Sequence, residues 1–500
     1  MDIREAKQQV KDTVEAYLAC DDAGMPRITS AEQRPIFLLG APGIGKTAIV
    51  SQVADELDIG LVAYSMTHHT RQSALGLPFI VHKTYRSGAE FDISEYTMSE
   101  IIASIYDYME ESGHDTGILF LDEINCVSET LYPSMLQFLQ FKTFGRHRVP
   151  EGWIVVCAGN PPEYNRNVHE FDIVTMDRLR RVDIEPSFEA WRVFSRERAV
   201  HPAITTYLEV RPDDFYLVES TPEGKSFVSA RSWSELSELM ALLEDLGKSV
   251  DSLVIGQYVQ HPEIAARFAS YYELFTKYRS DYQVEAILAG EAPEGIVERA
   301  RDAAFDERLA LMALLLESLG TAMRPLPERE QALGRTRDAL RAVRNRFSNL
   351  DDAAEDAPSF AEAFEEARQG LAGKTRPVRG TSIRSQEAAR VDARTQAFMR
   401  ELAVLPSYDA AADAYRTHVT MLEADVAGAS RQIDNAYAFI GEAFGEGSEM
   451  LVFTTELTAR RDTALFIARH GNETYAAKSA VLSTASHRDA IFDEIDALTQ

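Results

Sequence analysis

The residues with the clearest chemical signature form a short glycine-rich run. It has the spacing G-x-x-x-x-G-K-[ST] and lies between the apolar residues Ile36–Leu39 and a helix-forming segment. Glycines let backbone N–H groups turn inward around phosphate oxygens, and the N-terminus of the following helix adds the positive end of its dipole. In this pattern the lysine reaches the β- and γ-phosphates and the hydroxyl ligates Mg²⁺. The predicted nucleotide-binding residues are Gly40, Ala41, Pro42, Gly43, Ile44, Gly45, Lys46, Thr47 and Ala48.

Polar residues follow two other apolar runs. Asp122 and Glu123 come directly after Ile118–Leu121, and Asn160 follows Trp153–Ala158. We expect Asp122 to hold Mg²⁺ through water and Glu123 to polarise the attacking water as a general base. Asn160 is a candidate for positioning that water near the γ-phosphate. The alternatives are a strand that ends in solvated acids and an asparagine that only forms a turn.

Five short apolar runs, separated by longer helical patterns, must position these groups. Runs this short and this apolar are typical of strands buried on both faces of a parallel sheet. Their alternation with helices favours a βαβ architecture. The runs are Ile36–Leu39, Gly60–Met66, Ile118–Leu121, Trp153–Ala158 and Arg181–Ile184.

The chain divides into four predicted parts. Residues 1–35 indicate a helix and a polar loop, 36–186 an α/β nucleotide-binding core, 187–325 a helical domain, and 326–500 a further helical region. The last region contains a Gly/Pro/basic stretch that predicts a flexible segment near 370–385. It also contains apolar residues spaced by fours and threes from Tyr415 to Phe444. This spacing fits a long bundle helix or a coiled coil, within or between chains.

Composition limits the partners and the compartment. Lys+Arg number 51 and Asp+Glu number 79, so the net charge is −28, and such a chain is a poor non-specific ligand for DNA or anionic membranes. No run of about 18 apolar residues predicts a membrane-spanning helix. The N-terminal residues lack a secretory pattern, and three cysteines are too few for a disulfide framework. We therefore expect a cytoplasmic protein without a membrane partner, and nucleic acid is disfavoured.

In order and type, these motifs resemble AAA+ P-loop ATPases, and among them the MoxR-like branch of the helix-2-insert group. The resemblance extends from residue 30 to about residue 325. Ala230 departs from the pattern because that branch usually has proline there. The passages that carry the resemblance are Gly40–Thr47, Leu121–Asn125, Ala158–Pro162, Met176–Arg181 and Ser229–Trp233.

The resemblance implies roles for several arginines and a quaternary structure. Arg178 matches the arginine finger, which reaches the γ-phosphate of a neighbouring subunit, and Arg180 and Arg181 are alternatives in the same tract. Arg231 matches sensor 2, which touches the γ-phosphate from a helical lid formed by residues 187–325. ATP and Mg²⁺ are the implied cofactors. The implied assembly is a ring of identical subunits, usually a hexamer.

The resemblance also implies work on a partner protein. In the MoxR-like branch the partner is often a von Willebrand factor A domain protein, and ATP hydrolysis assists its assembly or remodelling. A β-hairpin is expected within Phe141–Gly152, and the inserted element near residues 79–100. Candidate pore contacts, or merely exposed tips, are Lys83, Tyr85, Arg86, Arg146, His147 and Arg148. Two rival functions are a nucleic-acid-linked or McrB-like NTPase and a nucleotide-gated scaffold that does not hydrolyse.

Overall fold

The chain forms two compact units. The first contains Met1–Trp191 and Phe215–Glu235, and the second contains Arg192–Asp214 and the chain from Leu236 onward. The predicted four-part division remains a prediction, and its limit at residue 325 lies inside the second unit. The computed structural model describes residues 1–68, 74, 76–144, 146–164, 168–221, 224–348, 360–372 and 383–480.

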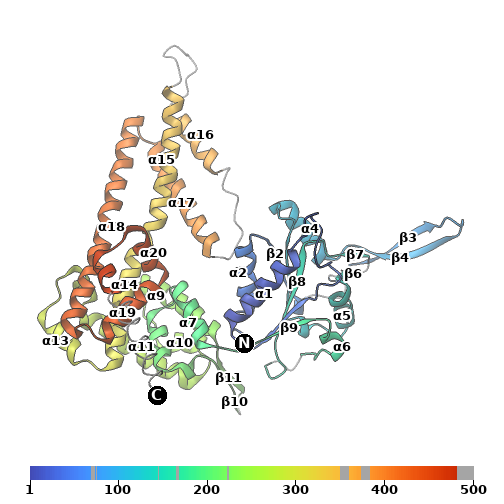
Figure 1. Ribbon diagram of the computed structural model, residues 1–500, viewed down its shortest axis with the longest axis horizontal. Helices are drawn as coiled ribbons and strands as arrows, with labels where there is room; N and C mark the ends of the chain where they lie inside the picture. The colour runs from blue at the N-terminus through green and yellow to red at the C-terminus, as the bar shows by residue number, and fades with distance from the viewer. Residues whose placement is uncertain are drawn as a thin grey trace, which may run out of the picture. The chain divides into compact units, whose positions relative to one another are not determined.

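A five-stranded parallel sheet forms the centre of the first unit (Figure 1). Its order is β2-β5-β8-β1-β9, so the strand before the glycine-rich loop lies between β8 and β9. The five apolar runs therefore form strands as predicted, which confirms the parallel α/β core. The strands are β1 (Ile36–Gly40), β2 (Gly60–Ser65), β5 (Gly117–Asp122), β8 (Trp153–Gly159) and β9 (Arg180–Ile184).

Helices cover both faces of this sheet. On one face, Ile36 and Leu38 are buried in a cluster with α1 (Ile3–Leu18) and α2 (Lys46–Leu57). On the other, Phe37 belongs to a cluster with α4 (Glu100–Ser112) and α5 (Tyr132–Phe141). Because neighbouring residues of a strand point to opposite faces, a continuous apolar run supplies both clusters.

The described residues of the first unit also form three two-stranded hairpins. The hairpin expected within Phe141–Gly152 is formed by β6 (Thr143–Phe144) and β7 (His147–Arg148). The element near residues 79–100 is a longer hairpin of β3 (Pro78–Thr84) and β4 (Glu90–Tyr96). The third, β10 (Leu217–Thr221) with β11 (Gly224–Val228), falls where only helices were predicted.

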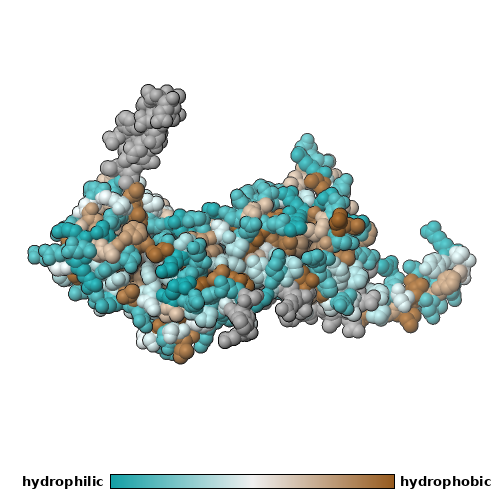
Figure 2. All heavy atoms as spheres, turned by 90° about the horizontal axis from the view of Figure 1, so that it is seen from below, coloured by the Kyte–Doolittle hydropathy of each residue, from teal (hydrophilic) through white to brown (hydrophobic). Residues whose placement is uncertain are grey.

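The two hairpins that were predicted as pore contacts touch each other. Arg146 forms an ion pair with Glu95, and the His147 ring lies 3.4 Å from the Tyr96 carbonyl oxygen. The β3–β4 hairpin extends away from the sheet (Figure 1), and hydrophobic side chains lie on its surface (Figure 2). Among them, Ile80 is 76% and Phe91 is 57% exposed. Whether these residues line a pore remains a prediction.

The second unit is helical. In it α15, α16, α17 and α18 run side by side (Figure 1). Residues 373–382 of the predicted flexible segment lie outside the described residues; α16 ends before them and α17 begins after them. Helix α6 (Ile173–Met176) belongs to the first unit. The other helices are α7 (Phe188–Glu197), α8 (Pro202–Val210), α9 (Ala230–Asp245), α10 (Ser252–Tyr258), α11 (Pro262–Tyr282), α12 (Val284–Ala289), α13 (Glu294–Asp302), α14 (Phe305–Met323), α15 (Leu326–Ser348), α16 (Phe360–Ala372), α17 (Ile383–Ala403), α18 (Tyr408–Phe444), α19 (Ser448–Ala459) and α20 (Arg461–His470).

The apolar series from Tyr415 to Phe444 lies on α18 and packs within the chain. Ile433, Tyr437 and Ile440 are fully or nearly fully buried, and α18 contacts α12, α13, α14, α15 and α19. The part of the series from Ile433 to Ile440 is therefore a buried face of a bundle helix. A coiled coil between chains is not needed to cover it.

One helical stretch, Phe305–Asn345, is long and apolar enough by composition to cross a membrane. However, 61% of its apolar window is buried inside the structure, and residues Ala310–Leu316 are buried consecutively. A helix that is apolar all round and covered by other helices is typical of a core helix. We therefore interpret α14 as the core helix of the second unit.

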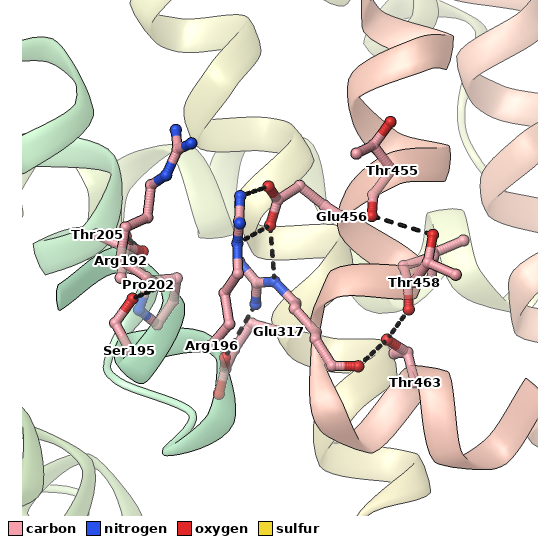
Figure 3. Close-up of polar contacts among 12 residues, drawn as sticks. Arg192, Ser195, Arg196, Pro202, Thr205, Glu317, Thr455, Glu456, Thr458 and Thr463 are labelled. Carbon is pink, nitrogen blue, oxygen red and sulfur yellow. Dashed lines mark hydrogen bonds and ion pairs between the residues drawn. The ribbon is translucent and has the colours of Figure 1, made fainter. Parts of the chain in front are cut away.

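Partly buried charges join the helices around α14. Arg196 of α7 donates through its Nε to Glu456 of α19 at 3.2 Å, and Glu317 of α14 lies beside them (Figure 3). Burial, with Glu456 nearby, raises the pKa of Glu209 on α8. Removing one member would leave a desolvated charge without its partner, so this cluster favours one packing of the helices.

Candidate functional site

The glycine-rich loop has the backbone conformations that its glycines permit. Gly43 and Gly45 have φ angles of 74° and 99°, which other residues rarely adopt. A Cβ on Gly43 would lie 2.8 Å from the Ser229 hydroxyl oxygen. The backbone N–H of Arg231 also donates to the Gly43 carbonyl at 3.1 Å. The segment that resembles sensor 2 is therefore in contact with the loop.

Lys46 is the buried cation of this loop. Its side chain is only 7% exposed, and its ammonium group donates to the carbonyls of Gly40 (2.7 Å) and Ala41 (2.8 Å) and to Asn160 Oδ1 (2.9 Å). Burial, opposed by Asp122 and assisted by the Arg231 charge, lowers the pKa of Lys46 to about 8. Lys46 thus joins the loop to the end of β8.

This lowered pKa predicts pH-dependent nucleotide affinity. The charged ammonium binds phosphate, so affinity is near its maximum at pH 7 and falls as the pH rises through about 8. Between pH 7 and pH 9 the Kd for Mg-ADP is expected to increase about tenfold, because the protonated fraction falls by that factor. Fluorescence titration with a labelled nucleotide measures it.

Lys142 provides a matched control. It is also buried, which lowers its pKa to about 8, but its Nζ donates to the Ser30 carbonyl at 2.7 Å and not to the glycine-rich loop. Lys142→Met should keep the pH dependence of the Kd for Mg-ADP. Lys46→Met should lose this pH dependence and most of the affinity for the nucleotide. A wild-type Kd that stays constant from pH 7 to pH 9 would contradict the assignment.

Thr47 and Asp122 meet at the start of α2 and the end of β5. The Thr47 hydroxyl donates to Asp122 Oδ2 at 2.9 Å. A hydroxyl and a carboxylate are oxygen ligands of the kind that Mg²⁺ prefers. Together with the glycine cradle and the buried ammonium, these residues fit a nucleotide with Mg²⁺. No group of three or more His, Cys, Asp or Glu residues suggests another metal site in the described part of the chain.

Glu123 has an unusual backbone conformation, and two hydroxyl groups bind its side chain. Its backbone has a φ of 55°, a left-handed value that is uncommon for residues other than glycine. Its Oε2 accepts hydrogen bonds from the hydroxyls of Ser65 (3.2 Å) and Thr67 (3.0 Å), at the end of β2 and just beyond it. The sequence analysis missed both residues. The sequence signal for them was their position at the end of a predicted strand.

Three candidate arginines differ clearly in their surroundings. Arg180 donates to Gln9 Oε1 at 2.8 Å, and Arg181 forms an ion pair with Asp183 at 2.7 Å. No hydrogen bond or ion pair engages the Arg178 guanidinium within the described residues. All three arginines are exposed, so Arg178 is the one whose guanidinium is open to another molecule.

Arg178 lines a surface hollow of about 440 Å³. Its other cations are Arg34, Lys142 and Arg148, against the acids Glu32 and Asp177. Arg148, predicted as a possible pore contact, thus lies beside the finger candidate. None of the lining residues belongs to the glycine-rich loop. The structure therefore brings together Lys46, Thr47, Asp122, Asn160 and Arg231 but places Arg178 in a different hollow.

Comparisons with known proteins agree with this geometry. Residues 36–166 match the family described as "ATPase family associated with various cellular activities (AAA)". The ORC1-type DNA replication protein 10 of Halobacterium salinarum is 28% identical over 127 residues, 24% of this chain and 30% of the relative. The ORC1-type DNA replication protein 15 of Haloarcula marismortui is 28% identical over 125 residues, 23% of this chain and 30% of the relative.

The match thus spans less than a third of the length of these relatives. The comparisons do not distinguish the MoxR-like branch. The parallel sheet, the glycine-rich loop and the family match together identify residues 36–166 as an AAA ATPase family domain.

Proposed function

We propose that this chain binds and hydrolyses Mg-ATP and works as a ring of identical subunits, in which Arg178 completes the nucleotide site of a neighbour. The observation that carries the proposal is the separation of two sets of residues. Lys46, Asp122 and Asn160 lie together at the carboxyl edge of the sheet. Arg178 lies in a hollow that contains none of them. A second copy resolves this separation, because it can place its Arg178 opposite the phosphates.

The residues of the site have distinct roles in the proposed reaction. Lys46 neutralises the β- and γ-phosphates, and Asn160 orients the attacking water. Glu123 accepts the proton of that water, and the Ser65 and Thr67 hydroxyls bind one of its two carboxylate oxygens. Bound Mg²⁺ would neutralise charge on the phosphate oxygens. Arg178, as a fixed guanidinium, neutralises charge that develops in the transition state.

The hollow around Arg178 supports assembly of identical subunits. Four cations and two acids line this hollow, whereas the whole chain carries a charge of −28. The hollow therefore complements the acidic surface of another copy. Close to it, Ile173 is 88% and Val174 is 57% exposed on α6. Exposed apolar residues beside a charged hollow are typical of an interaction surface.

The work of the ring is proposed to be the remodelling or assembly of a partner protein, as in the MoxR-like branch, with a von Willebrand factor A domain protein as the partner. The β3–β4 hairpin supplies a surface for such a partner. Its exposed aromatic residues Phe79, Tyr85 and Phe91 lie on a two-stranded sheet, which is marginally stable without further contacts.

A nucleic-acid-linked NTPase is the second candidate, because both relatives are named as DNA replication proteins. The net charge of −28 opposes it. Hydrolysis that accelerates on addition of duplex or single-stranded DNA, and loses this acceleration with added salt, would favour it over the partner-protein function.

ATP hydrolysis and mass by light scattering, measured on the wild type with and without Mg-ATP, test the main proposal. The expected result is ATP-driven growth from monomer to a ring-sized mass, with turnover that rises with protein concentration. Turnover per chain that stays constant at all protein concentrations would contradict a nucleotide site shared between two subunits. A chain that assembles and binds ATP without turnover would instead be a scaffold.

A further inference from the structure

Asn125 is a buried polar residue for which the proposed reaction above has no role. It lies in a short 3-10 helix (Ile124–Cys126) directly after Asp122 and Glu123 and is 3% exposed. Its side-chain Nδ2 donates to the backbone carbonyl of Asn160 at 2.8 Å. Its own carbonyl accepts from the backbone N–H of His169 at 2.8 Å. Asn125 therefore joins three segments that are distant in sequence.

The fit between Asn125 and β8 is close. A Cβ on Gly159 would lie 2.6 Å from Asn125 Oδ1, 2.8 Å from Cγ and 3.0 Å from Nδ2. The amide group of Asn125 therefore fills the space that a side chain at position 159 would need. Only glycine lets the strand end pass at this distance, so the peptide before Asn160 is held against Asn125.

The three segments that Asn125 joins all carry residues of the proposed site. The turn containing Asn125 also holds Glu123 in its left-handed conformation. The strand end carries Asn160, whose Oδ1 accepts from Lys46 at 2.9 Å. The segment containing His169 leads to α6 and Arg178. Asn125 thus fixes the base, the water-orienting amide and the approach to the finger relative to one another.

We propose that Asn125 is a positioning residue for ATP hydrolysis, which locks Asn160 in the orientation that aligns the attacking water. This inference rests on the proposed function. In this role Asn125 acts through the backbone carbonyl of Asn160, to which its Nδ2 donates. Its loss should consequently impair the reaction of bound ATP and spare ATP binding, which depends on Lys46 and the glycine-rich loop.

Steady-state kinetics of Asn125→Ala, Asn160→Ala and the double variant test this inference. Asn125→Ala should lower kcat about 10- to 100-fold and change KM less than about threefold, since a misoriented group affects the transition state more than ground-state binding. On the Asn160→Ala background the same change should lower kcat less than about threefold, because residues that act as a unit are not additive.

Two further variants separate positioning from loss of stability. Thr13→Val removes a buried hydroxyl that donates to the Gln9 carbonyl at 2.6 Å on α1. This variant should lose about as much thermal stability as Asn125→Ala, but its kcat should stay at the wild-type value. If Asn125→Ala does not fold, Asn125→Asp keeps the shape but removes the donor, and it should show the same loss of kcat.

Equal effects of Asn125→Ala on both backgrounds, or an increase in KM with unchanged kcat, would overturn the inference. So would a wild-type kcat in both Asn125 variants. A wild-type chain without turnover would instead contradict the proposed function, so the two failures are distinguishable.

Discussion

Glu123→Gln is expected to lower ATP turnover about 100-fold or more, because a positioned general base contributes on the order of 10²–10⁴ in rate. Glutamine keeps the size of the side chain, and its amide oxygen can still accept from the hydroxyls of Ser65 and Thr67. ATP binding and ATP-driven assembly should therefore remain. Steady-state phosphate release, nucleotide titration and light scattering on the same preparation measure the three quantities.

Glu129→Gln is the matched control, because Glu129 is an exposed acid shortly after the same turn and has no role in the proposed reaction. It should hydrolyse ATP at the wild-type rate. If Glu123→Gln retains full turnover, the base lies elsewhere. A slow turnover that is equal in the wild type and in Glu123→Gln would favour the scaffold function.

The central strands of the sheet could be predicted from the sequence because they are buried on both faces. The run Trp153–Ala158 is apolar at every position, and β8 is buried at every position. The β10–β11 hairpin could not be predicted in this way. In β11 both Gly224 and Lys225 are exposed and only Val228 is buried, so this strand has no continuous apolar run that would predict it.

To predict the direct contacts of the site, the strand order would have been needed as well as the motifs. Ser65 reaches Glu123 because β2 pairs with β5, with Ser65 opposite Asp122. Asn160 reaches Lys46 because β8 pairs with β1. Sequence spacing gives the residues at the end of each strand but not which strands are neighbours. The predicted phosphate, magnesium and base residues were therefore accessible to sequence analysis, whereas the hydroxyls that hold Glu123 were not.

The three arginines illustrate the same limit at the scale of single residues. The resemblance favours Arg178 as the finger and leaves Arg180 and Arg181 as alternatives in the same tract. The three residues differ in that Arg180 and Arg181 belong to β9 and already have partners in the first unit. Arg178 precedes the strand and lines the basic hollow. The assignment of the finger to Arg178 thus depends on its surroundings.

Arg178→Ala is expected to lower turnover about 1,000-fold, since an arginine finger is worth on the order of 10³–10⁵ in kcat. ATP binding should stay within about twofold of the wild type, because the ground-state contacts of the phosphates come from the other copy's glycine-rich loop. Arg181→Ala is the control. Arg181 is exposed and paired with Asp183, so its loss should change turnover little.

Mixing two inactive variants tests whether Arg178 acts on a neighbouring subunit. Arg178→Ala chains keep Glu123, and Glu123→Gln chains keep Arg178. In a mixed ring with head-to-tail interfaces, about one half times one half, or about a quarter, of the sites combine an intact Glu123 with an intact Arg178. Equimolar mixing should therefore restore turnover toward about a quarter of the wild-type rate, whereas Arg178→Ala mixed with the double variant Glu123→Gln/Arg178→Ala should restore none. If Arg178 served the site of its own chain, no mixture could pair the two groups, and turnover would stay at the level of the separate variants.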